Sequence, residues 1–139
     1  MNRSRLIALS LLLVAGPAWA ADEDIDVNPA MVAAEAWLAS VDAGRYGASW
    51  EDAAPMFQEA VSKVKWETTI DAARAPLGVP VRRKVRQALY TRALPSAPVG
   101  EYVVIQYDTY FETRPLSTEI VTPMRDTDGR WKVSDYVIR

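Results

Sequence analysis

Hydrophobic residues recur at helical spacing in the first part of the chain. Between Asn28 and Gly44 they fall three or four residues apart, which is typical of a helix with one buried face. Asn28 followed by Pro29 predicts the start of this helix, with Asn28 as the N-cap. Gly44 predicts its end. The residues expected on the buried face are Ala34, Trp37, Leu38 and Val41.

Two further amphipathic helices are expected before residue 78. Ser49 with Asp52 three residues later resembles a capping box, so a second helix should open at Ser49. Pro55 lies too deep for the first turn of this helix and predicts a kink or a restart. A third helix should begin near Ser62 and end at residues 75–78. Their expected core residues are Trp50, Ala53, Phe57, Ala60 and Val61, then Trp66, Ile70 and Ala73.

After Gly78 the period of the hydrophobic pattern changes to two, which is typical of strands. Four strands are predicted, at residues 79–94, 102–111, 116–125 and 130–138. The connections between them are short, and Asp128-Gly129 is a strong hairpin signal. We therefore predict an α+β fold, with N-terminal helices packed on one face of a four-stranded antiparallel meander sheet.

The first twenty residues have the features of a secretory signal peptide. Arg3 and Arg5 precede an apolar run, and Ala18 and Ala20 place small residues where signal peptidase cuts, so we expect cleavage after Ala20. An uncleaved anchor is the alternative, but the apolar run is shorter than the about 20 residues that span a bilayer. Residues 21–27 should form a short, acidic, flexible leader, and residues 28–139 a single domain.

Composition narrows the functions that the chain can carry. The sequence has no cysteine and no histidine, which excludes disulfides, thiolate metal sites, cysteine nucleophiles and serine-histidine triads. Its formal charge is -2, and loss of residues 1–20 leaves 14 basic and 18 acidic side chains, net -4. An acidic balance argues against a nucleic-acid partner. We expect a soluble periplasmic protein, with full secretion as the alternative, and no integral membrane segment in the mature chain.

Metal and cofactor sites are not predicted. Asp126-Thr127-Asp128-Gly129 begins like a calcium-binding loop, but the later ligand positions hold Trp131, Val133 and Ser134. The chain contains no glycine-rich phosphate loop. We interpret the four residues as a hairpin turn.

Polar residues at alternating strand positions form the first candidate site. In the second strand, alternate residues over 103–111 form the more apolar side, which should face the helices. If matching sides of the first and last strands coincide with it, Arg83, Gln87, Tyr107 and Asp135 lie inside an apolar cup. Convergent polar groups in such a cup are typical of a ligand site. Alternatively they lie at its rim or neutralise one another, with Arg83 pairing with Asp135.

A row of cations forms the second candidate. Arg82, Lys84 and Arg86 should project from one face of the first strand, where they could meet anionic lipid, envelope polysaccharide or an acidic partner. The alternative is a solvated outer face. In that case the residues that balance the row would be Asp108, Glu112 or Glu119.

Tyrosines on the outward side of the sheet form the third candidate. Tyr102 and Tyr110 should lie there with Val104, and Tyr90 should lie with the cationic row. Such a face could be a homodimer or partner surface. Alternatively, scattered tyrosines are ordinary strand-forming residues.

Several short segments spread over nearly the whole mature chain together form a recognisable pattern. They are Trp37-Leu38, Val41-Asp42-Ala43-Gly44, Tyr46, Ser49-Trp50, Phe57, Trp66, Ala75-Pro76-Leu77-Gly78, Gly100-Glu101-Tyr102-Val103-Val104, Gly129-Arg130-Trp131-Lys132-Val133 and Tyr136-Val137-Ile138-Arg139. With these segments the chain resembles the bacterial exported proteins of the domain-of-unknown-function 4019 family, a resemblance that implies no activity, cofactor or catalytic residue. The order of helices followed by a meander is also similar to the cystatin-like and nuclear-transport-factor-2-like architecture.

Two functions are compatible with these features. The first is a non-enzymatic module that binds a small apolar ligand in the cup or a protein of the cell envelope over the sheet. The second is a small acid-base enzyme, isomerase- or dehydratase-like, with Asp135 as general base and Tyr107 polarising a carbonyl. The absence of histidine weakens the enzymatic alternative, because enzymes of the resembled architecture often use one.

Overall fold

The computed structural model describes residues 25–139, so the predicted signal peptide and residues 21–24 of the predicted leader lie outside the described residues. Residues 25–27 precede the first helix without regular structure. The elements in chain order are α1 (Asn28–Asp42), α2 (Tyr46–Asp52), α3 (Pro55–Ala60), α4 (Lys63–Arg74), the 3-10 helix η1 (Ala75–Leu77), β1 (Pro80–Thr91), β2 (Tyr102–Phe111), β3 (Ser117–Arg125) and β4 (Trp131–Ile138).

The start of α1 lies one residue earlier than predicted. Asn28 is its first residue and not its N-cap, a position that Val27 occupies without a capping side-chain hydrogen bond. The Asn28 N–H instead donates to Asp26 Oδ1 at 3.0 Å. Pro29 lies in the first turn as expected, and Gly44 follows the helix with φ +73°, a left-handed conformation that glycine adopts without strain.

The prediction of a capping box at Ser49 is wrong, because α2 begins at Tyr46 and Ser49 lies inside it. Ser49 is fully buried. Its hydroxyl donates to the Tyr46 carbonyl at 2.6 Å and accepts from Trp66 Nε1 at 2.9 Å. A side chain committed to buried partners cannot also cap a helix, and sequence spacing does not distinguish the two uses.

The next two helix starts are confirmed. The chain restarts at Pro55, which opens α3 as a separate short helix. Ser62 is the N-cap of α4 and accepts from the Lys65 N–H at 3.2 Å. Gly78, with φ +73°, follows η1 and directs the chain into β1.

The predicted four-stranded antiparallel meander is confirmed, with strand order β1-β2-β3-β4. Three register shifts interrupt its alternation. Val81 is an extra residue on β1 between Pro80 and Arg82. Arg86 is an extra residue on β1 between Val85 and Gln87, and Ser134 is an extra residue on β4 opposite the step from Thr122 to Pro123. Because side chains alternate with a period of two, each bulge reverses the face of the residues that follow it.

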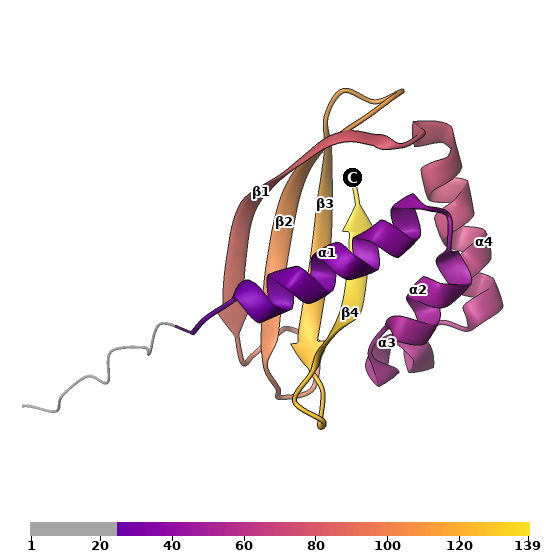
Figure 1. The fold of residues 1–139 in the computed structure, drawn as a ribbon. Helices are drawn as coiled ribbons and strands as arrows, with labels where there is room; N and C mark the ends of the chain where they lie inside the picture. The colour runs from indigo at the N-terminus through magenta and orange to yellow at the C-terminus, as the bar shows by residue number, and fades with distance from the viewer. Residues whose placement is uncertain (1–24) are drawn as a thin grey trace, which may run out of the picture.

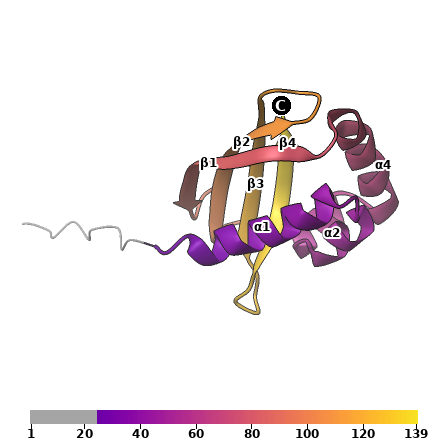
Figure 2. The same cartoon turned by 45° about the horizontal axis from the view of Figure 1, so that its top comes forward.

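The helices lie on one side of the sheet and at one of its edges. Figures 1 and 2 show α1 running across one face, while α2, α3 and α4 group beside β4. The Ala54 N–H donates to the Val133 carbonyl at 2.8 Å, so the chain entering α3 covers the edge of β4. No helix within residues 25–139 has the length and apolar character that a membrane span requires.

Aromatic side chains fill the junction between the helices and the sheet. Trp37 of α1 has its ring centroid 5.8 Å from that of Trp66 in α4 and 5.4 Å from that of Tyr136 in β4. Phe57 of α3 meets Trp66 edge-on at 4.9 Å. The four side chains expected to be buried in α1 are buried, and so are Phe57, Trp66 and Ile70. Ala60 is exposed, because α3 ends at the surface.

Candidate functional site

The four residues predicted to line the cup are divided between the two faces of the sheet. Arg83 and Tyr107 point toward the helices, as predicted. Gln87 and Asp135 are exposed, because the bulges at Arg86 and Ser134 reverse the alternation just before them. The predicted cup therefore does not form. Arg83 does not pair with Asp135.

The space expected to be the cup is occupied by packed side chains. Ile105, Tyr107 and Val121 lie there at no more than 2% exposure, against buried residues of α1. The Tyr107 hydroxyl is buried without a hydrogen-bond partner among the described residues. Burial, together with the negative charges of Glu35 and Glu119, raises the pKa of Tyr107 to about 12.

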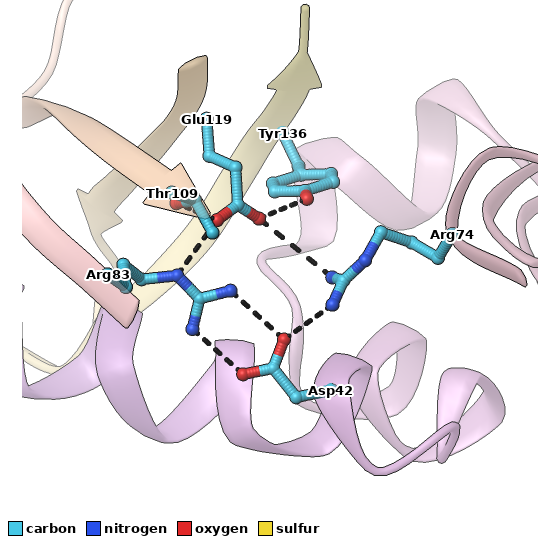
Figure 3. A network of polar contacts seen from close by, with 6 residues as sticks. All are labelled: Asp42, Arg74, Arg83, Thr109, Glu119 and Tyr136. Atoms are coloured by element: carbon cyan, nitrogen blue, oxygen red, sulfur yellow. Dashed lines mark hydrogen bonds and ion pairs between the residues drawn. The ribbon is translucent and has the colours of Figure 1, made fainter. Parts of the chain in front are cut away.

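A buried network of charged side chains joins the helices to the sheet where Arg83 points inward (Figure 3). Its charged members come from four different elements, Asp42 from α1, Arg74 from α4, Arg83 from β1 and Glu119 from β3. Arg74 and Glu119 are at most 4% exposed. We call these four residues the buried charge network.

The two carboxylates of this network are bridged by both arginines. Asp42 accepts from Arg83 Nη1 and Nη2 at 2.8 and 3.0 Å, and from Arg74 Nη2 at 2.7 Å. Glu119 Oε1 accepts from Arg83 Nε at 2.8 Å, and Arg74 Nη1 lies 3.8 Å from Glu119 Oε2. The formal charges of the four groups cancel, so the cluster is neutral as a whole.

Two hydroxyl groups complete the shell around Glu119. Thr109 Oγ1 of β2 donates to Glu119 Oε1 at 2.5 Å, and the Tyr136 hydroxyl of β4 donates to Glu119 Oε2 (Figure 3). Burial and the neighbouring Glu119 carboxylate raise the pKa of Tyr136. Tyr136 therefore stays protonated and remains a donor to Glu119.

Electrostatics keep Asp42 and the two arginines of the network in their charged forms. Burial by itself would raise the pKa of Asp42, but the hydrogen bonds from Arg83 and Arg74 outweigh it, and that pKa is lowered. For Arg83, burial opposes the charged form, yet Asp42 and Glu119 raise its pKa. A carboxylate held by two arginines is a poor proton acceptor, so this arrangement suits structural pairing better than acid-base chemistry.

The predicted basic row lies on the opposite, helix-free face of the sheet. Arg82, Lys84 and Arg86 are exposed there, as expected. Arg86 forms an ion pair with Asp108, which was one of the predicted balancing residues. Glu119 is not a balancing residue of this row, because it is buried on the inward face.

The predicted outward tyrosines differ from one another. Tyr110 lies on the outer face with the guanidinium carbon of Arg82 4.4 Å from its ring centroid. Tyr102 is fully buried beneath the loop between β1 and β2, and its hydroxyl donates to the Pro98 carbonyl of that loop at 2.7 Å. Tyr90 points inward, since it follows the bulge, and packs against the core.

A hollow of about 460 Å³ lies on the same helix-free face. We call it the outer hollow. Its floor is formed by outward residues of the sheet, and its walls by α3 and the loop after β1. Within this lining, Asp135 is the one charged side chain. The lining residues are Met56, Ala60, Leu94, Pro95, Ser96, Ala97, Val104, Ile120, Thr122, Ser134 and Asp135.

Residues 33–136 match a family that is described as a protein of unknown function, DUF4019. The chain belongs to this family. No curated protein and no solved structure matches it. The segment that matches the DUF4019 family runs from α1 into β4 and contains both the buried charge network and the outer hollow.

Three of the four charged members of the network were missed in the sequence of this DUF4019 protein. Asp42 and Arg74 lie at the ends of helices, where charged residues are ordinary. The inward position of Glu119 could have been predicted, because Glu119 lies on the same side of its strand as Ser117 and Val121, which are buried. A carboxylate in the middle of an inward strand side needs a cationic partner, and Arg83 was already predicted to point inward.

Proposed function

We propose that this DUF4019 protein is a non-enzymatic binding module of the periplasm, and that it holds a small apolar ligand in the outer hollow. The observation that carries this proposal is an apolar, solvent-facing concavity on the helix-free face of the sheet. Met56, Leu94, Val104 and Ile120 contribute apolar surface to it. Ligand pockets of proteins are mostly apolar concavities with few polar groups, and this lining has that character.

The enzymatic alternative lacks a geometric basis. Tyr107 lies on the inward face, whereas Asp135 lies on the outward face. A general base and a carbonyl-polarising hydroxyl must reach one substrate, so residues on opposite faces of a sheet cannot share that work. The carboxylates of the buried charge network are bound by Arg74 and Arg83, which removes them as bases.

Binding of Nile red, a neutral apolar dye, tests the proposal. We expect saturable binding, and we expect Ala60→Trp to weaken it by about tenfold, because an indole at the wall of the hollow would fill it. Ala39→Trp is the matched control. It places the same side chain at an exposed alanine of α1, away from the outer hollow.

Equal affinity in the two variants would refute the outer hollow as the binding site. Absence of saturable dye binding by the native protein would refute apolar ligand binding altogether. Thermal unfolding of both variants reports whether either substitution damages the fold, and a variant with native Tm isolates the effect on binding.

The periplasmic part of the proposal depends on the predicted signal peptide, residues 1–20. Expression of the full chain followed by osmotic-shock fractionation should place the protein in the periplasmic fraction. Its mass should correspond to a chain that begins at Ala21. A full-length mass in the cytoplasmic fraction would overturn this part of the proposal.

A further inference from the structure

The outer hollow and the basic row lie on the same face of the sheet, at opposite ends of the strands. Val104 of β2 lines the hollow. Asp108, four residues further along β2, pairs in register with Lys84 of β1. Four residues of an antiparallel strand span about 14 Å, which is the distance along the strand from Val104 to Lys84. Ile120 of β3 also lines the hollow and pairs with Gln106, so the near edge of the hollow lies only about 7 Å along the strand from Lys84.

Two cations of the basic row remain available to a ligand. Arg86 is neutralised by Asp108. Arg82 and Lys84 form no ion pair with any residue in the part of the chain that the structure describes. The guanidinium of Arg82 rests on the ring of Tyr110, which holds its planar group in place while its N–H donors stay exposed. Both side chains are exposed.

Between these two features, the one carboxylate on the outer face of β2 is Asp108, which lies opposite Lys84 and is neutralised by Arg86. Gln106 and Ile120 pair across β2 and β3, and Val137 pairs with Ile120 across β4. These outward residues form a strip of apolar and amide side chains. The face therefore combines an apolar concavity, a neutral strip and two unpaired cations along one direction.

We propose that the ligand of the outer hollow is a single anionic acyl-chain amphiphile of the fatty-acid type. This inference rests on the proposed function and names the class of its ligand. The alkyl chain lies in the hollow, and the anionic head lies between Arg82 and Lys84. One leaflet of a bilayer contributes about half of its roughly 30 Å hydrocarbon core, so an acyl chain reaches at least about 15 Å. A chain of that length crosses the about 7 Å between Lys84 and the near edge of the hollow and places its distal part in the hollow.

The charges at the two ends of the proposed binding face decide which way the amphiphile lies. An anion gains from Arg82 and Lys84 by electrostatic complementarity. Asp135, which lies at the hollow, would oppose an anionic head there and favours the uncharged tail at that end. A cationic amphiphile would bind in the reverse orientation, with its head at Asp135. Substitutions at Asp135 and at the two cations should therefore have opposite effects on the affinities for anionic and cationic amphiphiles.

Displacement of Nile red from the full mature chain by two probes of equal chain length tests the inference. The probes are dodecanoate and dodecyltrimethylammonium, each below its micelle concentration. We expect dodecanoate to displace the dye at about tenfold lower concentration than the cation does. Substitution of both free cations, Arg82→Gln with Lys84→Gln, should weaken dodecanoate binding by about tenfold and leave Nile red binding unchanged.

Two further variants sharpen the interpretation. Arg45→Gln with Lys65→Gln removes the same total charge from the helical side of the molecule, and dodecanoate should bind that variant as it binds the native protein. Asp135→Asn should leave dodecanoate affinity unchanged or raise it, because it removes a like charge. A loss of dodecanoate affinity in Asp135→Asn, or in the helical control, would overturn the orientation.

Each remaining outcome separates the inference from the proposed function. If Nile red binds but dodecanoate does not displace it, the ligand class is wrong and the apolar site stands. If neither binds, both proposals fail. Binding to phosphatidylglycerol vesicles without binding of monomeric dodecanoate would also overturn the inference, because it would identify the face as a membrane-docking surface.

Discussion

Substitution of Glu119 by glutamine removes one charge from the buried charge network while keeping the shape of the side chain. Glu119 is 0% exposed and faces Arg83 at 2.8 Å and Arg74 at 3.8 Å. With glutamine in this position, the two arginines are balanced by Asp42 alone. The network then carries one uncompensated positive charge in a largely buried site, where Arg74 is 4% and Arg83 17% exposed.

The expected loss in the free energy of unfolding follows from the burial of these charged groups. Breaking a buried ion pair by removing one partner costs about 3–5 kcal/mol. The amide of glutamine can still accept from Thr109 Oγ1 and Arg83 Nε, so we expect about 3 kcal/mol. A domain of this size unfolds with about 5–15 kcal/mol, and a loss of about 3 kcal/mol lowers its Tm by about 12 °C.

Urea and thermal unfolding followed by tryptophan fluorescence measure this loss, because Trp37 and Trp66 are buried in the core. Glu51→Gln is the matched control. It makes the same substitution in an exposed ion pair with Lys63, where the side chains are 59% and 41% exposed. Exposed pairs contribute little, so its unfolding should stay close to native. A loss below about 1 kcal/mol for Glu119→Gln would refute the reasoning.

Two further predictions concern neighbouring groups. Tyr107→Phe removes a buried hydroxyl without a partner, so it should leave the free energy of unfolding unchanged or raise it by about 1 kcal/mol. Tyr136→Phe leaves Glu119 Oε2 without its hydroxyl donor and should lower the free energy of unfolding by about 1–3 kcal/mol. Urea unfolding distinguishes these signs, and equal effects would contradict the prediction. The pKa of Asp42 is lower in the folded protein than its ordinary value of 3.8, so its contribution to stability is present above about pH 4 and lost as the pH falls through the folded pKa. Asp42→Asn should therefore be less stable at pH 7 and lose less stability between pH 5 and pH 2, and parallel pH profiles would contradict this assignment.

The helices and strands could be predicted because each depends on local periodicity. The buried face of α1 and the restart at Pro55 were recognised from residue spacing alone. Ser49 was interpreted as a cap because serine at that spacing is common there. Its true role depends on Trp66, which is 17 residues away in the chain, and a contact of that kind leaves no local pattern.

Only two of the four residues predicted to line the cup were placed on the correct face, again because the positions of the others depend on non-local structure. Arg83 and Tyr107 were placed on the inward face correctly. Arg83 lies between the two irregularities of β1, and β2 has no extra residue before Tyr107. Gln87 and Asp135 were misplaced, because each follows a single extra residue on its strand. A bulge changes the hydrogen-bonded register between two strands, and the sequence of one strand carries little trace of it.

The sequence alone determined the α+β class, the order of the helices and strands, and the exclusion of cysteine and histidine chemistry. Residue type and period are local properties, so they can be recognised without a fold. Only the tertiary structure decided that Asp42, Arg74, Arg83 and Glu119 meet in one buried cluster, and that a hollow opens on the helix-free face. Both depend on strand register and on how the helices pack against the sheet, which are relations between segments far apart in the chain.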